Sequence, residues 1–165
     1  MKLQGKVALI TGASRGIGKA IAKVFSGEGA SLALNYNWPR TELGEMAIVD
    51  DVLSVSGTQI ILVQADVAKL SDLTEMLSKV MAYFGRIDIL VNNIGWALPT
   101  FFIEENEEYW NKVLAINSKT QLLVTQAVLK DMSKRKGGKI VNISSDAGRV
   151  GQLQGVVYSL CKAGV

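Results

Sequence analysis

The chain has 165 residues, the size of one domain, of which 48% are apolar and 20% charged, and a chain of this length can bury a core without disulfides or metals. One cysteine and no histidine exclude an internal disulfide and argue against a zinc site. We therefore expect no bound metal. The net charge is +3, and the basic run at 130–139 is typical of the charged end of a helix, so we expect no nucleic-acid partner.

The sequence gives no sign of a membrane or export signal. No apolar run approaches the ~18 residues that a membrane span needs. The apolar run KVALIT at 6–11 is too short for a signal peptide and is typical of a strand. We therefore expect a soluble, cytoplasmic protein with no membrane partner.

Short apolar runs alternate with longer amphipathic segments along the chain. The short runs are rich in Val, Ile and Leu with little polar alternation, which predicts strands buried on both faces of a parallel sheet. They lie at 6–11, 31–36, 59–64, 86–92 and 139–144. Helices are predicted at 18–30, 41–57, 71–85 and 105–134.

Two features of the predicted helices can be checked residue by residue. Ile21, Val24 and Phe25 are expected on the buried face of the first helix. Ser71 is expected to cap the start of the third helix and Gly85 to end it. Five strand–helix repeats predict an α/β, doubly wound, Rossmann-like three-layer sandwich, with residues 1–165 as a single dinucleotide-binding domain.

A glycine-rich turn follows the first strand and precedes the first helix. Gly12, Gly16 and Gly18 are spaced G-x-x-x-G-x-G. Such glycines allow a tight turn, a close approach of backbone amides to a pyrophosphate, and tight packing of helix on strand, while the helix N-terminus favours an anion. Because the turn lies between a strand and a helix, it predicts dinucleotide binding and not a plain loop.

The end of the second strand bears on the choice between NAD and NADP. An acidic residue there would bond the ribose of NAD and repel the phosphate of NADP. This chain has Tyr36 and Asn37 at that place, with Arg15 in the glycine turn and Arg40 beyond the strand. The absence of a carboxylate and the two arginines predict a preference for NADP(H).

Several polar residues stand where apolar ones are expected. Asn92 and Asn93 at the end of the fourth strand need backbone or ligand partners, since burial without a hydrogen bond is costly. Asp66 follows the third strand and either caps the next loop or binds an adenine amino group. Asn117 lies inside a long predicted helix, where asparagine is unfavourable unless it packs or has a function.

The end of the chain combines a serine, a tyrosine and a lysine. Ser144 and Ser145 end the fifth strand, and ligands of open α/β sheets bind beyond the carboxyl ends of strands. Tyr158 and Lys162 are four residues apart, on one face of a helix. A lysine ammonium at that distance stabilises a tyrosinate, so the two form an acid–base pair without histidine.

Together these segments resemble the short-chain dehydrogenase/reductase family, specifically its Tyr-x-x-x-Lys enzymes. The matching segments are TGASRGIG at 11–18, DV at 66–67, NNIG at 92–95, Asn at 117, ISS at 143–145 and YSLCK at 158–162. One departure is Ile94, where the family has alanine. The resemblance implies an NAD(P)(H) cofactor held by Gly12, Ser14, Arg15, Gly16, Ile17, Gly18, Tyr36, Asp66, Val67, Asn93, Gly95, Tyr158 and Lys162.

The resemblance also implies the catalytic roles. Tyr158 exchanges a proton with the substrate oxygen, and Lys162 stabilises the tyrosinate and holds the nicotinamide ribose. Ser145 hydrogen-bonds the substrate oxygen, and Asn117 holds a water that links Lys162 to a proton relay.

The substrate is left open among three classes. TGASRGIG and LNY resemble 3-oxoacyl-(acyl-carrier-protein) reductases, whereas NNIGW and SSDAGRVG resemble enzymes acting on hydroxyacyl-CoA thioesters. Sugar or polyol dehydrogenases are the third class. Trp96, Leu98 and Phe101 either line an apolar entrance or pack within their loop.

Family members continue past the Tyr-x-x-x-Lys motif with two more strands and a segment that covers the substrate. The resemblance therefore implies a C-terminally truncated sheet of about five strands, with 139–144 at its edge. Two functional classes follow: an NADP(H)-dependent oxidoreductase, or a non-catalytic nucleotide-binding remnant of one. The exposed edge and apolar helix faces predict a homo-oligomer.

Overall fold

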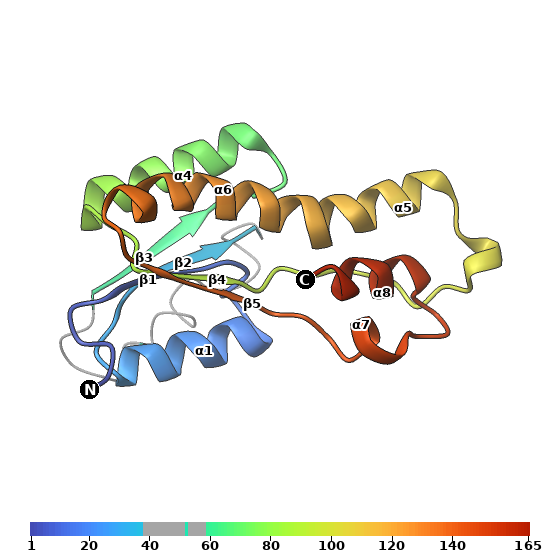
Figure 1. The fold of residues 1–165 in the computed structure, drawn as a ribbon, viewed down its shortest axis with the longest axis horizontal. Coiled ribbons are helices and arrows are strands. Elements are labelled where there is room, and N and C mark those ends of the chain that lie inside the picture. The colour runs from blue at the N-terminus through green and yellow to red at the C-terminus, as the bar shows by residue number, and fades with distance from the viewer. Residues whose placement is uncertain (38–51, 53–58) are drawn as a thin grey trace.

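A five-stranded parallel sheet with strand order β3-β2-β1-β4-β5 forms the centre of the molecule (Figure 1). The computed structural model describes residues 1–37, 52 and 59–165. The strands are β1 (Val7–Ile10), β2 (Ser31–Tyr36), β3 (Ile60–Gln64), β4 (Ile89–Asn92) and β5 (Lys139–Asn142). All five predicted strands are confirmed, and β2 has the predicted bounds.

Helices cover both faces of this sheet, which confirms the doubly wound three-layer architecture. The helices are α1 (Gly16–Gly27), α4 (Leu70–Phe84), η1 (Phe102–Glu104), α5 (Glu107–Leu114), η2 (Ala115–Lys119), α6 (Thr120–Lys134), α7 (Ala147–Val150) and α8 (Val156–Ala163). In Figure 1, α4 and α6 lie on one face of the sheet and α1 lies on the other. Among the described residues, none of the helices has the length and apolar character to cross a membrane.

Two apolar clusters hold these layers together. Leu73, Met76 and Val128 pack between α4, α6 and the sheet, and Ala22 and Leu32 pack between α1 and the opposite face. Strands β1 and β4 are fully buried, as expected for inner strands of a parallel sheet. Each buried Leu or Met stabilises the fold by roughly 1.5–3 kcal/mol. Strand β5 pairs with β4 and is mostly exposed.

The ends and faces of two helices differ from the prediction. Ile21 and Phe25 pack against the core as predicted, whereas Val24 is 63% exposed, and α1 buries Ala22 and Ser26 most deeply. Helix α4 starts one residue before Ser71, whose hydroxyl bonds Asp72 within the first turn and caps nothing. Gly85 ends α4 as predicted, with a left-handed φ of 73° and its N–H on the carbonyl of Met81.

The predicted helix at 105–134 begins at 107 and is interrupted. The π-helical turn η2 separates α5 from α6, and Asn117 lies at its centre. Asn106 caps the start of α5 through its side chain, which accepts the N–H of Tyr109. The predicted helix at 41–57 lies outside the described residues except for Val52, which is buried and whose carbonyl accepts the hydroxyl of Ser26.

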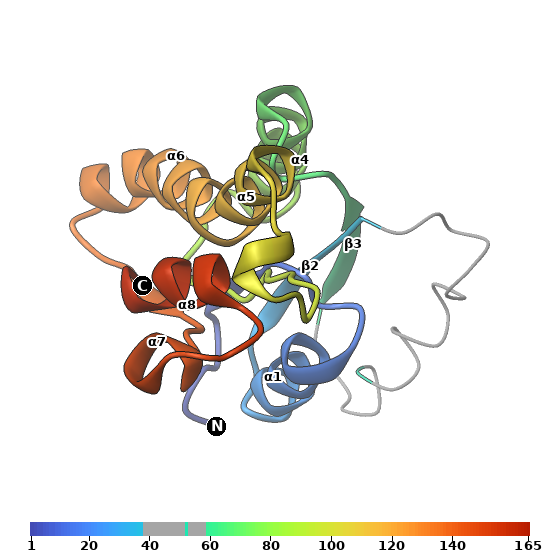
Figure 2. The ribbon, with the colours of Figure 1, turned by 90° about the vertical axis from the view of Figure 1, so that its right-hand side faces the viewer.

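The remaining short elements gather at one end of the sheet. Figure 2 looks at the molecule from this end and shows α7, α8 and η1 in front of the sheet. Since every strand is parallel, this is the end where their carboxyl termini meet, and it is where ligands of open α/β folds bind.

Candidate active site

A cavity of about 610 Å³ opens beyond the carboxyl ends of the strands. Its walls come from the glycine turn, the segment after β4, the end of β5 and α8. Six residues predicted for the site line it: Arg15, Ile17, Asn93, Gly95, Tyr158 and Lys162. The cavity has the size of a small-molecule site, and it joins residues that are up to 147 positions apart in the sequence.

The glycine turn has the geometry that the sequence predicts for a phosphate cradle. Gly12 and Gly16 have φ values of 62° and 54°, which other residues rarely adopt. A Cβ on Gly18 would lie 2.6 Å from Nδ2 of Asn93, so only glycine lets α1 approach the sheet here. No side chain caps the start of α1, and its first N–H groups can therefore serve an anion. The residues present fit a dinucleotide.

Two asparagines brace this turn. The amide of Asn93 donates to the carbonyls of Thr11 and Gly12 at 3.1 and 3.0 Å. The side chain of Asn35 accepts the N–H of Gly12 at 3.3 Å and donates to the carbonyl of Ala65 at 3.1 Å. Asn93 thus has the backbone partners expected for it. Asn35 is fully buried within β2 and was missed, although a polar side chain inside an apolar strand is itself a signal.

Asn92 is held by side chains instead of backbone groups. Its amide donates to the hydroxyl of Thr125 and to the side-chain oxygen of Asn142, both at 2.9 Å. These bonds link the end of β4 to α6 and β5, so Asn92 stabilises the floor of the site and does not line it.

Lys162 is a buried cation within the cavity wall. Its side chain points to the carbonyl of Ile143 at 2.9 Å, and the residue is only 4% exposed. Burial lowers the pKa of Lys162 from its ordinary value, and the neighbouring Cys161 opposes this effect without cancelling it. No acidic side chain pairs with Lys162 in the described part of the chain.

Tyr158 lies beside this lysine and faces the same cavity. The Nζ atom of Lys162 is 5.8 Å from the centre of the Tyr158 ring. Among the described residues, no hydrogen bond engages the Tyr158 hydroxyl. Gly95 completes the wall, since a Cβ there would lie 3.5 Å from Nζ of Lys162. The Tyr158 hydroxyl is therefore available to a ligand, and it lies near the ammonium of Lys162 in a site that is partly shielded from solvent.

Asn117 is buried behind the cavity and does not line it. Its side-chain oxygen accepts the N–H of Trp96 at 3.0 Å, and its amide donates to the carbonyls of Trp96 and Val113 at 2.6 and 2.9 Å. The asparagine therefore fixes the segment after β4 against the π turn, and such turns are frequent at functional sites. Its predicted contact with a relay water stays a prediction.

The two serines after β5 take different positions. Ser144 lines the cavity, and its hydroxyl donates to the backbone carbonyl of Lys162 at 2.6 Å. The hydroxyl of Ser145 accepts the N–H of Ala147 at 3.2 Å, and Ser145 does not line the cavity. The predicted bond from Ser145 to a substrate oxygen stays a prediction.

Besides the three glycines of the turn, four residues predicted to bind the cofactor do not line the cavity. Ser14, Tyr36 and Val67 are buried, and Val67 belongs to the apolar core beneath α4. The carboxylate of Asp66 accepts the N–H of Ala68 at 3.1 Å, which is the loop cap considered for it. Their cofactor roles stay predictions, and Arg40 lies outside the described residues.

The apolar segment after β4 forms one side of the cavity. Trp96 and Leu98 line it, whereas Phe101 is 44% exposed and does not. The hydroxyl of Tyr109 donates to the carbonyl of Leu98 at 2.9 Å and accepts its N–H at 3.2 Å. Lys112 stacks its ammonium over the ring of Trp96 at 4.3 Å. Helix α5 thus holds the entrance in place.

Comparison with known proteins gives consistent matches over nearly the whole chain. A family model described as short chain dehydrogenase matches residues 6–165. A 3-oxoacyl-[acyl-carrier-protein] reductase of Synechocystis sp. is 39% identical over 163 residues, and the alignment covers 99% of this chain and 65% of that protein. The 3-oxoacyl-[acyl-carrier-protein] reductase FabG of Escherichia coli is 35% identical, with 100% and 65% covered.

Solved structures agree with this result. A mutant short-chain dehydrogenase/reductase of Serratia marcescens superposes with a TM-score of 0.89 at 32% identity, and the match covers 99% of this chain and 65% of that one. The chain therefore spans just under two thirds of the length of these relatives.

Proposed function

Because the chain belongs to the short-chain dehydrogenase family, we propose that its cavity binds NADP(H) and that the protein interconverts a carbonyl and an alcohol there. The observation that carries the proposal is the shared cavity: the Tyr158–Lys162 pair lines the same space as Arg15 and Ile17 of the glycine turn. In this proposal, residues 1–165 act as one dinucleotide-binding unit.

The glycine turn and α1 are proposed to hold the pyrophosphate. The left-handed glycines bring backbone amides toward it, and the uncapped N-terminus of α1 offers N–H groups to its charge. Asn35 and Asn93 keep the turn in this shape. A bound nicotinamide cofactor supplies a hydride, while the chain supplies position and a proton.

The preference for NADP(H) rests on charge at the end of β2. Tyr36 and Asn37 occupy the place where an acid would select NAD, and Arg15 lines the cavity nearby. An arginine can pair with the extra phosphate of NADP(H) in a charge-assisted contact. Because no carboxylate stands at this position to repel that phosphate, we expect NADP(H) to bind more tightly than NAD(H).

Tyr158 is proposed as the acid–base group. In reduction its hydroxyl gives a proton to the carbonyl oxygen, and in oxidation the tyrosinate takes the proton of the alcohol. The ammonium of Lys162, 5.8 Å from the ring, stabilises the tyrosinate, and partial burial strengthens this attraction. Ser145 is proposed to hold the substrate oxygen, and Asn117 to hold a water that returns protons to Lys162.

The best-supported substrate class is a 3-oxoacyl thioester. Two relatives at 35% and 39% identity are named as 3-oxoacyl-[acyl-carrier-protein] reductases. The apolar wall of Trp96 and Leu98 suits the alkyl part of such a substrate. Three assays would rank the classes: a fall in reduced-nicotinamide absorbance with NADPH and a 3-oxoacyl thioester, and a rise with NADP⁺ and either a hydroxyacyl-CoA or a polyol.

We also propose that two copies associate through α6. Leu122 and Leu129 are 71% and 44% exposed on that helix and line one surface groove together with Leu123, and contiguous exposed apolar surface is typical of interaction sites. Sedimentation of the chain at increasing concentration should show a dimer, and Leu122→Lys should shift it to the monomer.

Replacing Tyr158 by Phe tests the mechanism directly. We expect turnover to fall by at least ~10³-fold, within the range for loss of a general acid, while the Kd for NADPH changes by less than about threefold. Tyr83→Phe is a matched control, because Tyr83 is 58% exposed on α4 and lies outside the cavity. Turnover retained in the Tyr158→Phe protein would refute the assignment.

A further inference from the structure

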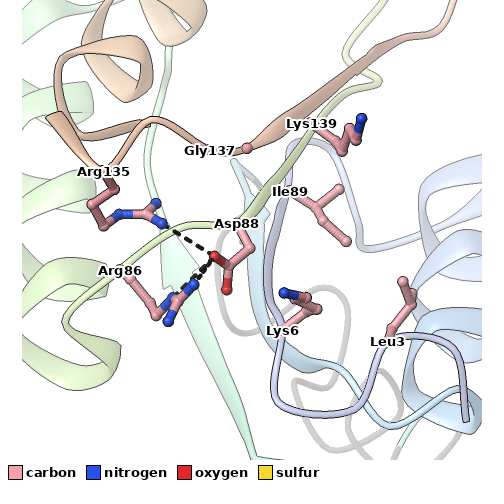
Figure 3. Close-up of a pocket in the computed structure, with 9 residues that line it drawn as sticks. Leu3, Lys6, Arg86, Asp88, Ile89, Arg135, Gly137 and Lys139 are labelled. Atoms are coloured by element: carbon pink, nitrogen blue, oxygen red, sulfur yellow. Dashed lines mark hydrogen bonds and ion pairs between the residues drawn. The ribbon is translucent and has the colours of Figure 1, made fainter. Parts of the chain in front are cut away.

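A second cavity, of about 310 Å³, opens at the opposite end of the sheet (Figure 3). It lies at the amino ends of β1, β4 and β5, and no residue of the proposed active site lines it. Leu3 and Ile89 give it an apolar floor, and Gly137 and Gly138 form part of its rim.

Positive charge dominates the lining of this cavity. Lys6, Arg86, Arg135 and Lys139 line it together with a single acidic residue, Asp88. The cations come from segments far apart in the sequence, which the parallel sheet brings to one edge. Figure 3 shows the ammonium of Lys6 on the side that faces Asp88, and the ammonium of Lys139 above Ile89, pointing away from Asp88.

Asp88 is already fully engaged by protein groups. Its Oδ1 accepts Nε of Arg86 at 2.9 Å and Nη1 of Arg135 at 3.2 Å, and its Oδ2 accepts the N–H of Val7 at 3.0 Å. Arg135 is committed as well, because it also pairs with Asp131 at 2.7 Å. Asp88 and Asp131 together balance the charges of the two arginines, and the two lysines are left uncompensated.

Lys6 and Lys139 have no ion-pair partner in the described part of the chain. Their backbones are nevertheless fixed, since the N–H of Lys6 bonds the carbonyl of Leu3 and that of Lys139 bonds the carbonyl of Asp88. The N–H of Gly138 bonds none of the described residues and adds a donor at the rim.

We propose that this second cavity binds a phosphate group, as inorganic phosphate or as the phosphate of a small organic ester. A phosphate offers several oxygens in a tetrahedral arrangement, so it can accept bonds from Lys6 beside β1 and from Gly138 and Lys139 at the start of β5. The apolar floor and the volume leave room for a small organic group beside it. The inference is independent of the proposed function at the other end of the sheet.

The test is a titration with inorganic phosphate at constant ionic strength, followed in two-dimensional amide NMR spectra. We expect saturable shifts of the amides of Lys6, Gly138 and Lys139. The combined variant Lys6→Ala with Lys139→Ala should bind at least about tenfold more weakly, because it loses two charge-assisted contacts.

Two controls make the result specific to the cavity. The variant Lys23→Ala with Lys134→Ala removes the same charge from exposed sites outside the lining, and it should bind within about twofold of the wild type. Arg15→Ala should also leave these shifts unchanged, which separates this cavity from the proposed cofactor site. The proposal is overturned if the shifts do not saturate, if they centre on residues 12–18, or if both double variants lose affinity equally. Should the Lys6 and Lys139 variant fail to fold, the wild-type shift map alone decides.

Discussion

The two ends of the sheet each bury one charged side chain, but among the described residues only the one at the amino end has partners of opposite charge. At the amino end, Asp88 is 6% exposed and accepts hydrogen bonds from two arginines and a backbone amide. At the carboxyl end, Lys162 is 4% exposed and meets only a backbone carbonyl. A buried charge that is satisfied within the chain costs the fold less than one left uncompensated, and we propose that Lys162 is retained despite that cost because it serves a ligand.

The pKa shifts follow this difference. Burial alone would raise the pKa of Asp88, but the bonds from Arg86 and Val7 and the charges of Arg86 and Arg135 hold it below its ordinary value. Burial lowers the pKa of Lys162, which has no carboxylate to oppose that effect. The charged form is thus favoured at the amino end and disfavoured at the carboxyl end.

The largest expected effect on stability is at Asp88. Asp88→Asn should lower the free energy of unfolding by about 2 kcal/mol in urea denaturation, because two arginines lose their shared buried carboxylate. Glu75→Gln is the control, since Glu75 pairs with Lys79 on the exposed surface of α4 and should matter by less than ~0.5 kcal/mol. Similar losses in both variants would contradict the comparison.

The same substitution should change the response to acid. The pKa of Asp88 is lower in the folded state, so its contribution is fully present above its unfolded value of about 3.9 and is lost as the pH falls through the folded value. The wild-type advantage over Asp88→Asn should therefore shrink below about pH 4. If the difference in the free energy of unfolding between the wild type and Asp88→Asn stayed constant well below pH 4, the charge of Asp88 would not be its cause.

At the carboxyl end, Arg15 should affect ligand choice. Arg15→Ala should weaken NADPH binding about tenfold, or ~1.4 kcal/mol, and NADH binding by no more than about twofold. Arg149→Ala, whose side chain is 81% exposed on α7, provides the matched loss of charge. Equal losses for the two nucleotides would show that Arg15 does not read the extra phosphate.

The smallest effect on the free energy of unfolding is expected at Lys162, and the sign of that effect is what distinguishes the two ends of the sheet. Lys162→Met should leave the free energy of unfolding at neutral pH unchanged or raise it by about 1 kcal/mol, while turnover is lost. The pKa of Lys162 is lower in the folded state, so between the folded value and the unfolded value of about 10.4 the unfolded chain binds more protons than the folded chain. The free energy of unfolding of the wild type should therefore rise with pH in that range, relative to that of the variant. A loss of stability above 1 kcal/mol at neutral pH would mean that Lys162 stabilises the fold.

The sequence predicted the five strands, and it singled out six residues that the structure brings to one cavity, because those signals are local. Apolar runs located all five strands, and the glycine spacing located the turn that Gly12 and Gly16 form. The four-residue spacing of Tyr158 and Lys162 placed both side chains on one wall of the cavity. Each of these patterns is set within a few residues of chain.

The features that were missed depend on packing between distant segments. Val24 faces solvent because α1 turns Ala22 and Ser26, with Ile21 and Phe25 beside them, toward the sheet, and periodicity alone did not fix that rotation. The π turn around Asn117 arises where that side chain bonds the backbone of Trp96. The second cavity joins Lys6 to Lys139 through the sheet order, and nothing near either lysine in the sequence indicates the other.

The most direct test of the central claim is a fluorescence titration of this chain with NADPH and with NADH. Trp96 lines the cavity, so the protein's own emission should report occupancy. We predict saturable binding of both nucleotides, tighter for NADPH, with the preference reduced by Arg15→Ala. If neither nucleotide binds saturably, the cavity at the carboxyl end of the sheet is not a dinucleotide site in this chain.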